Sequence, residues 1–282
     1  MNQSEQPSLI QPEDLLEDLD QWNGKILDCR GRNEYEKSHI PGAISVPANL
    51  LQDPDSERGQ LYSWDKVRSL LMDWGVGSTG PWFLYDDAGF VAAGRVFWVL
   101  EYFGVNNIAV LDGGWMVWNK NRYPTSNQVV KPYQGTLNTP VQSRVIADKA
   151  DVLKVLESNG RVHSHGKPLS ETILLDTRTL EEYQGTKITA ERNGHIPGAI
   201  HCNWENNIVD LFTPKFKPLD TLSDYYSDLG VTSEQEVIVY CRTGSRSCQT
   251  YLTLKLLGYK RVRNYVGSWL DWGNDPEVPV ES

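Results

Sequence analysis

The sequence predicts an α/β protein built from two copies of one domain, each a parallel sheet covered by helices. Two observations lead to this prediction. Several segments recur in the same order in the two halves of the chain, and within each half short β-branched apolar runs alternate with helical patterns. Alternating strands and helices form parallel sheets that are covered on both faces. A chain of 282 residues is long enough for two domains of ordinary size.

Four pairs of segments carry the internal repeat. One pair is identical, since His-Ile-Pro-Gly-Ala-Ile occupies both 39–44 and 195–200. The other pairs are 26–30 with 174–178, 82–86 with 238–241, and 113–118 with 267–272. Ordered self-similarity of this kind is the signature of a duplicated domain. We therefore predict domains at 1–124 and 143–282, joined by a polar linker with Pro and Gly at 125–142.

The second half shows its elements most clearly. Its apolar runs predict strands at residues 144–147, 173–175, 199–201, 237–240 and 263–266. A helix is expected over 149–156, with Asp148 as its N-cap. A second helix is expected over 247–257, ended by Gly258 in the C′ position.

Composition and charge exclude several functions. The formal net charge is −10 and basic runs are absent from the sequence, which argues against a nucleic-acid partner. No run approaches the roughly 20 apolar residues that cross a bilayer, and the amino terminus does not resemble a signal peptide. We expect a soluble cytoplasmic protein without a membrane partner. The four cysteines do not have metal-ligand spacing, so no metal is expected.

Cys241 is the candidate nucleophile. It follows a nearly all-apolar predicted strand and precedes a predicted helix, and ligands of open parallel sheets bind at such strand ends. The loop after it can curl so that its N–H groups point inward, with Gly244 supplying a positive φ. The helix N-terminus, Arg242 and Arg246 add positive charge, which lowers the pKa of a thiol.

The other three cysteines are expected to be buried apolar residues. Cys248 lies two helical turns after Cys241, on the predicted buried face of the helix. Cys29 and Cys202 end predicted strands that are not followed by a basic loop. Small buried cysteines are common in protein cores.

Taken together, these motifs resemble the two-domain rhodanese family over nearly the whole chain. The resemblance rests on the tandem halves, the repeated His-Ile-Pro-Gly-Ala-Ile, Gly-Ser-Trp-Leu-Asp-Trp at 267–272 and Cys-Arg-Thr-Gly-Ser-Arg at 241–246. It implies two tandem rhodanese-like domains, each with a five-stranded parallel sheet flanked by helices. It also implies a catalytically silent first domain. Asp86 occupies the position of Cys241 in this first half, and a carboxylate cannot form a persulfide.

The family's reaction would need no cofactor. The Cys241 thiolate would attack the outer sulfur of thiosulfate, sulfite would leave, and cyanide or another thiol would take the sulfur from the persulfide. The family also implies the residues that hold the anionic donor: Arg242, Thr243, Gly244, Ser245, Arg246 and Ser247. Arg178 matches a family arginine that reaches the pocket, and an ion pair with a nearby carboxylate such as Glu182 is the alternative role for it.

Two further expectations follow from the resemblance. His39 lies in the silent half, so we expect both it and His195 to be structural residues. Internally paired domains often need no partner subunit, so a monomer is expected.

Three other functions remain open. In the family, vertebrate-like thiosulfate enzymes typically show the loop Cys-Arg-Lys-Gly-Val-Thr, and 3-mercaptopyruvate enzymes show Cys-Gly-Ser/Thr-Gly-Val-Thr. This loop shares the arginine of the thiosulfate enzymes and has a second positive charge. Both charges favour the dianion thiosulfate as donor, with 3-mercaptopyruvate as the alternative. Cys-dependent phosphatases and arsenate reductases use a Cys-x5-Arg loop, whereas Arg246 gives a shorter Cys-x4-Arg. A non-catalytic binding module is the third possibility, and the presence of Cys241 with basic neighbours argues against it.

Overall fold

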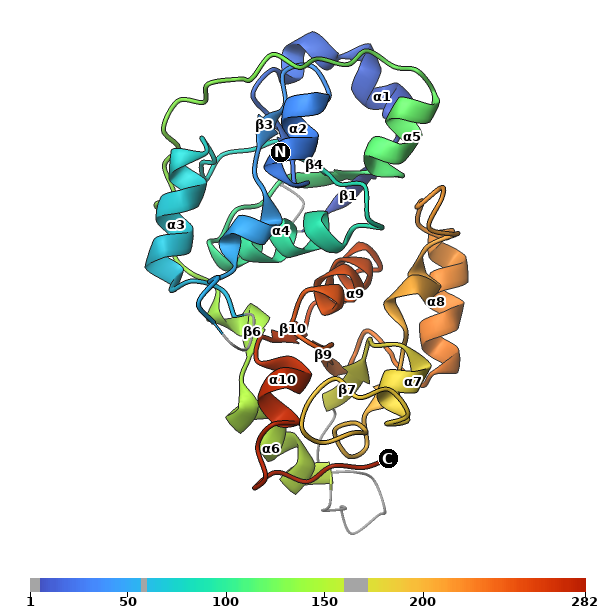
Figure 1. Ribbon diagram of the computed structural model, residues 1–282. Helices are drawn as coiled ribbons and strands as arrows, with labels where there is room; N and C mark the ends of the chain where they lie inside the picture. The colour runs from blue at the N-terminus through green and yellow to red at the C-terminus, as the bar shows by residue number, and fades with distance from the viewer. Residues whose placement is uncertain (1–5, 57–59, 160–171) are drawn as a thin grey trace. The chain divides into compact units, whose positions relative to one another are not determined.

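The computed structural model describes residues 6–56, 60–159 and 172–282. The chain forms two compact units (Figure 1). Unit 1 comprises Met1–Ser143 and Asn207–Pro218, and unit 2 comprises Arg144–Asn206 and Leu219–Ser282. Each unit contains one five-stranded parallel sheet, so the predicted α/β fold class with two parallel sheets is confirmed.

Unit 1 has the strand order β1-β5-β4-β2-β3. Its strands are β1 (Ser8–Ile10), β2 (Ile26–Asp28), β3 (Ile44–Ser45), β4 (Trp82–Tyr85) and β5 (Ile108–Leu111). Its helices are α1 (Pro12–Glu17), α2 (Arg32–Lys37), α3 (Trp64–Asp73), α4 (Val91–Tyr102) and α5 (Gly114–Lys120), with 3-10 turns at Leu19–Trp22 and Ala48–Leu51.

Unit 2 has the order β6-β10-β9-β7-β8, which is the same topology repeated. Its strands are β6 (Ile146–Ala147), β7 (Thr172–Asp176), β8 (Ile200–His201), β9 (Glu236–Tyr240) and β10 (Val262–Tyr265). Its helices are α6 (Lys149–Asn159), α7 (Leu180–Tyr183), α8 (Leu219–Asp228), α9 (Arg246–Leu256) and α10 (Ser268–Trp272), with 3-10 turns at Ser143–Val145 and Trp204–Asn207. The duplication seen in the sequence is therefore a duplication of structure.

The predicted elements of the second half agree closely with those observed. The main exception is the strand predicted over 144–147, because Arg144 and Val145 lie in a 3-10 turn ahead of β6. Asp148 caps α6 as predicted, because its Oδ1 accepts the Asp151 N–H at 2.9 Å while Asp151 Oδ2 accepts the Asp148 N–H at 3.1 Å. Gly258 follows the end of α9 with a φ of +87°, the left-handed conformation expected at C′.

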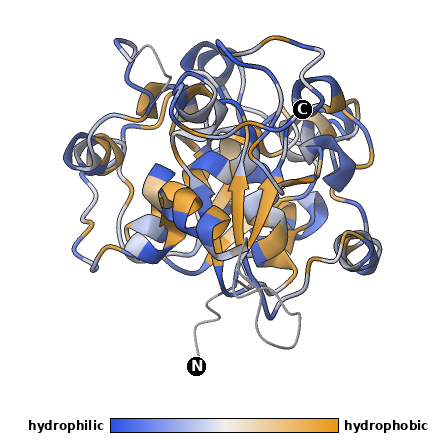
Figure 2. Ribbon diagram, turned by 90° about the horizontal axis from the view of Figure 1, so that it is seen from below, coloured by the Kyte–Doolittle hydropathy of each residue, from blue (hydrophilic) through white to orange (hydrophobic). Residues whose placement is uncertain are grey.

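The central strand of unit 2 is fully covered. Residues 237–240 of β9 are inaccessible to solvent, as expected for a parallel strand between two helical layers. Helices α6 and α10 contribute Val152, Trp269 and Trp272 to a core cluster with Ile238 and Tyr240. Helix α9 contacts β9 and β10. Figure 2 shows strands that are predominantly hydrophobic between helices of mixed character.

Two irregular segments complete unit 1. The predicted linker, residues 125–142, follows the surface of this unit through backbone hydrogen bonds, for example from Gly135 N–H to Met72 O at 2.7 Å. Residues 207–218 belong to unit 1 although they come from the second half of the sequence. Phe216 stacks on Phe90 with 4.1 Å between ring centroids, and its N–H donates to Asp112 Oδ1 at 3.0 Å.

Candidate active site

Cys241 is the first residue after β9, at the carboxyl end of the central strand of unit 2 (Figure 1). Residues 241–247, called the cysteine loop below, lead directly into α9. Gly244 has a φ of +78°, and a Cβ at this position would lie 3.0 Å from Val266 O. Both the backbone conformation and the close approach therefore require glycine.

The Cys241 sulfur is surrounded by hydrogen-bond donors although its side chain is only 1% exposed. The N–H groups of Thr243 and Ser247 hydrogen-bond to it, and the Ser247 hydroxyl lies 3.6 Å away. Burial raises the pKa of the thiol, but the Arg246 charge and these hydrogen bonds outweigh burial, so that its pKa lies below the ordinary value. The loop thus favours a thiolate at Cys241.

Burial has the opposite net effect on two other cysteines. It raises the pKa of Cys29 well above its usual value and raises that of Cys202 to about 11. All four cysteines are buried and free of disulfides, as expected for Cys29, Cys202 and Cys248. Cys241 differs from Cys29 and Cys202 in its donors and its positive neighbour, not in its burial.

The start of α10 fixes the backbone of the loop. Trp269 N–H donates to Cys241 O at 3.0 Å, and Leu270 N–H donates to Arg242 O at 3.0 Å. Ser268 Oγ accepts the Cys241 N–H at 3.2 Å. Ser268 has a φ of +50°, a strained conformation for a residue with a Cβ.

Unit 1 contains the same loop with a different occupant. The register of β2 with β4 and of β7 with β9 aligns Tyr85 with Tyr240. The next residues, Asp86 and Cys241, therefore occupy equivalent positions, as the sequence repeat predicted.

The Asp86 carboxylate is held by four backbone N–H groups. Its Oδ1 accepts from Ala88 at 3.2 Å and from Phe90 at 3.0 Å. Its Oδ2 accepts from Ala92 at 2.8 Å and from Ala93 at 3.0 Å. Burial raises the pKa of this carboxyl, and the N–H groups act in the opposite direction. This loop therefore directs its amides at an acceptor placed at the end of the central strand.

The two loops differ in charge. Unit 1 has Asp86 and Asp87, and unit 2 has Cys241 and Arg242 at the same places. The cradle of unit 1 is filled by its own carboxylate, whereas that of unit 2 surrounds a sulfur atom next to positive charge. Unit 2 is therefore the half suited to a reactive anion.

Arg246 forms a bidentate ion pair with Glu182. The distances are 2.7 Å from Nη1 to Oε2 and 2.9 Å from Nη2 to Oε1. Burial tends to raise the pKa of Glu182, but Arg246 outweighs this and lowers it to about 2. Arg246 is thus anchored to α7 while its charge acts on Cys241. Its predicted contact with a donor molecule stays a prediction.

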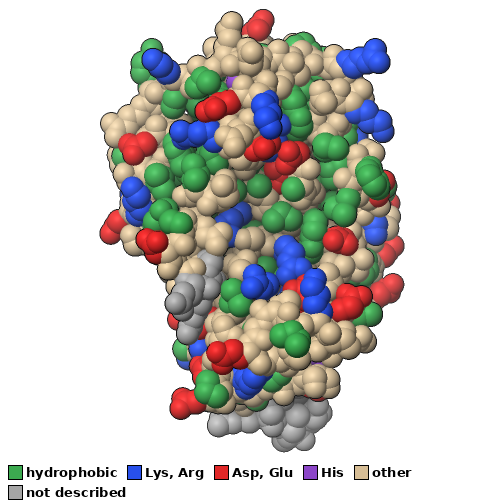
Figure 3. Space-filling view, viewed as in Figure 1, with side chains coloured by type: hydrophobic (Ala, Val, Ile, Leu, Met, Phe, Trp, Pro, Cys, Tyr) green, Lys and Arg blue, Asp and Glu red, His purple; other side chains and the backbone are tan. Residues whose placement is uncertain are grey.

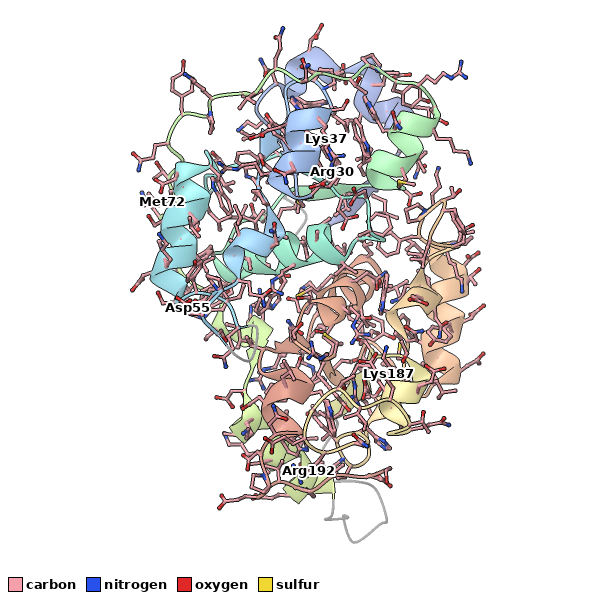
Figure 4. All side chains as sticks on the ribbon, viewed as in Figure 1. Arg30, Lys37, Asp55, Met72, Lys187 and Arg192 are labelled. Atoms are coloured by element: carbon pink, nitrogen blue, oxygen red, sulfur yellow. The ribbon has the colours of Figure 1, made fainter. Side chains whose placement is uncertain are left out.

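Arg242 points outward instead. It is exposed, and its Nε donates to Thr189 O at 3.3 Å. Lys187 lies two residues before Thr189 and is also exposed. Figure 3 shows Lys and Arg side chains close together on this part of unit 2, where Figure 4 labels Lys187. The neighbourhood of the cysteine loop is therefore locally positive although the chain as a whole is acidic.

Arg178 is fully buried and paired. Its Nε and Nη2 donate to the Asp176 carboxylate at 2.9 and 2.5 Å. Nη2 also donates to Gly194 O at 2.7 Å, and the guanidinium lies 4.4 Å from the centre of the Trp269 ring. The structure thus shows the expected ion pair with a nearby carboxylate, but the partner is Asp176, because Glu182 is bound by both Nη atoms of Arg246.

Unit 1 repeats this arrangement. Arg30, labelled in Figure 4, pairs with Asp28 at 2.6 Å and lies 4.3 Å from the Trp115 ring. Because unit 1 keeps the pair although it has Asp86 in place of Cys241, a structural role for Arg178 is favoured. Its role in substrate binding stays a prediction.

The two histidines of the repeated motif also match. His39 stacks on Tyr35 at 3.9 Å and His195 on Tyr183 at 3.7 Å, and each Nδ1 lies within hydrogen-bond distance of the backbone oxygen of its partner. Both positions agree with the structural role expected from the sequence.

Residues 6–56, 60–159 and 172–282 contain neither a metal-ligand cluster nor a membrane-spanning helix. Within these ranges no three His, Cys, Asp or Glu side chains are grouped as metal ligands would be. Within the same ranges every helix is too short or too polar to span a bilayer.

Sequence reasoning missed three residues around the loop. Glu182, Ser268 and Asn264 come from α7, α10 and β10, and each contacts the cysteine loop. A comparison of the two halves offers a signal for Asn264, because it replaces an apolar residue in the equivalent strand. Neither ion-pair partners nor hydroxyl contacts leave such a signal.

Comparisons with known proteins agree with this architecture. The Rhodanese-like domain profile matches residues 11–121 and 161–275. The thiosulfate sulfurtransferase of Pseudomonas aeruginosa is 31% identical over 279 residues, covering 99% of this chain and 98% of the relative. The thiosulfate sulfurtransferase of Azotobacter vinelandii is 30% identical over 276 residues, covering 98% and 97%.

A solved structure shows the same fold. The anaerobic ergothioneine biosynthesis enzyme from Chlorobium limicola, in complex with trimethyl histidine, superposes with a TM-score of 0.82 at 22% identity, covering all of this chain and 71% of the other. Fold and site together define a tandem α/β protein with a cysteine loop at the end of a central strand. The chain belongs to the rhodanese family, which confirms the resemblance seen in the sequence.

Arg246→Gln tests the electrostatic account of the site. The variant should shift the pH midpoint of Cys241 alkylation by iodoacetamide upward by about one pH unit, because it removes a positive charge next to the sulfur. Arg263→Gln is the matched control, since Arg263 also pairs with carboxylates in unit 2 but contacts Asp151 and Glu236. Equal midpoints in the two variants would contradict a role for the Arg246 charge.

Proposed function

We propose that this protein is a sulfurtransferase that moves sulfane sulfur from thiosulfate to cyanide or a thiol through a persulfide on Cys241. The observation that carries the proposal is the duplicated loop. In unit 1 it holds a carboxylate with four backbone N–H groups, and in unit 2 the same position holds a thiol whose pKa is lowered. A persulfide is an anion that such a cradle would stabilise.

The first step forms the persulfide. The Cys241 thiolate attacks the outer sulfur of thiosulfate, a new S–S bond forms, and the S–S bond of thiosulfate breaks. Sulfite leaves with the electron pair of the broken bond. The N–H groups of Thr243 and Ser247 point at Cys241 and are placed to hold the negative charge that remains on the transferred sulfur.

The second step returns the enzyme to its starting state. Cyanide or an acceptor thiolate attacks the outer sulfur of the persulfide and takes it as thiocyanate or as a new persulfide. The Cys241 thiolate is the leaving group, and the lowered pKa of its thiol makes it a good one. Neither step requires a cofactor.

The donor is proposed from charge. Arg242 is exposed next to the loop, and an exposed guanidinium suits a dianion such as thiosulfate better than a keto acid with one charge. 3-Mercaptopyruvate is the alternative donor. Phosphate chemistry is less well supported, because the Arg246 guanidinium is already bound by both oxygens of Glu182.

Intact mass after incubation with thiosulfate tests the reaction and the residue together. We expect the wild-type protein to gain the mass of one sulfur atom and to lose it on addition of cyanide, whereas Cys241→Ser should gain nothing. Cys202→Ala is the matched control because it removes another buried cysteine of unit 2, and it should load sulfur normally. Loading of Cys241→Ser, or failure of the wild type to load from either donor, would contradict the proposal.

Arg242→Ala tests the donor site. Its KM for thiosulfate should rise about fivefold, since a charge-assisted hydrogen bond to the donor is lost, while kcat with saturating donor changes little. Lys154→Ala removes an exposed cation from α6 in the same unit and serves as the control for net charge. If both variants keep the wild-type KM, Arg242 does not bind the donor.

A further inference from the structure

A buried polar cluster lies beneath the cysteine loop. It consists of Asn264 on β10, the Ser247 hydroxyl, the Gly244 carbonyl and the Cys248 thiol, whose sulfur lies 3.3 Å from Asn264 Nδ2 and 3.0 Å from Gly244 O. Asn264 and Ser247 are both inaccessible to solvent. Buried polar groups in a sheet core are costly unless they are hydrogen-bonded, so their presence here calls for a physical reason.

The hydrogen bonds fix the orientation of the Asn264 amide. Its Nδ2 lies 3.1 Å from Gly244 O, and a carbonyl oxygen can only accept. The amide nitrogen therefore faces the loop backbone, and Oδ1 faces Ser247 at 2.7 Å. Since Oδ1 can only accept, the Ser247 hydroxyl donates its proton to Asn264.

Ser247 connects Asn264 to the reactive sulfur. Its Oγ lies 2.7 Å from Asn264 Oδ1 and 3.6 Å from Cys241 Sγ. A hydroxyl has a single proton, so it can donate to Asn264 or to the sulfur anion but not fully to both. Because Asn264 accepts the hydrogen bond of the Ser247 hydroxyl, it supports the sulfur through the loop backbone, by binding the Gly244 carbonyl and fixing the Ser247 side chain, and not through a hydroxyl donation to Cys241.

Unit 1 shows that the fold does not need this cluster. The register of β4 with β5 places Val110 opposite Leu84, and that of β9 with β10 places Asn264 opposite Val239. Leu84 and Val239 are equivalent, so Val110 occupies the Asn264 position. Ala92 occupies the Ser247 position, six residues after Asp86 as Ser247 is six after Cys241. Unit 1, which has Asp86 in place of Cys241, thus fills both places with apolar side chains.

The nature of the occupant explains the difference. In unit 1 the cradle is held together by Asp86, whose carboxylate is part of the chain and is always present. In unit 2 the Cys241 sulfur accepts from the Thr243 and Ser247 N–H groups, and in the proposed reaction a second sulfur atom joins it and leaves again. The amides of the second loop therefore need another support when the outer sulfur is absent.

We propose that Asn264 is a positioning residue, which binds the Gly244 carbonyl and the Ser247 hydroxyl so that the cysteine loop keeps its donors directed at the sulfur. It acts through these two groups and does not touch the substrate. The effect on sulfur loading rests on the proposed function, whereas the effect on the Cys241 thiol does not.

Asn264→Val gives unit 2 the residue that unit 1 has at this register. We expect the pH midpoint of Cys241 alkylation to rise by about one pH unit and the rate of persulfide loading from thiosulfate to fall about tenfold. A residue that only stabilised the fold would leave the midpoint unchanged. Asn264→Leu is the second variant, because it has nearly the same shape and no charge, cannot donate to Gly244 O, and should also raise the midpoint.

Two comparisons make the test specific. Thr253→Val removes a buried hydroxyl from α9, the helix that also contains Ser247. Thr253 Oγ1 donates to Gln249 O at 2.9 Å and does not contact Cys241, so this variant should keep the wild-type midpoint. Ser247→Ala combined with Asn264→Val should raise the midpoint at least as far as Asn264→Val alone, because it also removes the hydroxyl that Asn264→Val frees to donate to the sulfur.

The outcomes separate this inference from the proposed function. If the wild type loads sulfur but Asn264→Val and Asn264→Leu keep its midpoint and loading rate, the inference is overturned and the function stands. If the wild type never loads sulfur, the function fails, and the alkylation midpoints alone decide whether Asn264 positions the donors around Cys241.

Discussion

The convergence of backbone N–H groups on one point, at the carboxyl end of the central strand, is the constraint on which both units depend. A strand must end there, a glycine must allow the chain to curl, and a helix must begin at once. Only an acceptor or an anion can occupy such a point without leaving several buried donors unpaired. In unit 1 that acceptor is the Asp86 carboxylate, and in unit 2 it is the Cys241 sulfur.

The duplication turns this constraint into an internal comparison. The two sheets have the same strand order, and the Arg–Asp pair under an aromatic ring appears in both. Features shared by the two units belong to the architecture, whereas features present only in unit 2 are candidates for chemistry. The second group contains the ion pair of Arg246 with Glu182, the exposed Arg242, and the hydrogen bond between Ser247 and Asn264.

Much of the fold, and the position of the candidate nucleophile, could be predicted from the sequence. The repeat indicated two domains, apolar runs indicated parallel strands, and the Asp148 cap and Gly258 stop marked helix ends that the structure confirms. These features depend on local chemistry, which is visible in a single sequence. The position of Cys241 after a buried strand was also apparent.

The partners of the side chains could not be predicted in the same way. Arg178 binds Asp176 instead of Glu182, and Glu182 holds Arg246. The pairing of carboxylates with guanidiniums depends on how loops from three elements fold together. The sequence alone does not give the distances between these side chains. Asn264 was missed because a polar residue within a short strand resembles an ordinary edge or surface position.

The most direct test of the account is a crystal structure of the protein after exposure to thiosulfate without an acceptor. The account predicts an extra sulfur atom bonded to Cys241 Sγ and within hydrogen-bond distance of loop N–H groups, at the place that the Asp86 carboxylate oxygens occupy in unit 1. An unmodified Cys241, or a persulfide turned away from these amides, would contradict it.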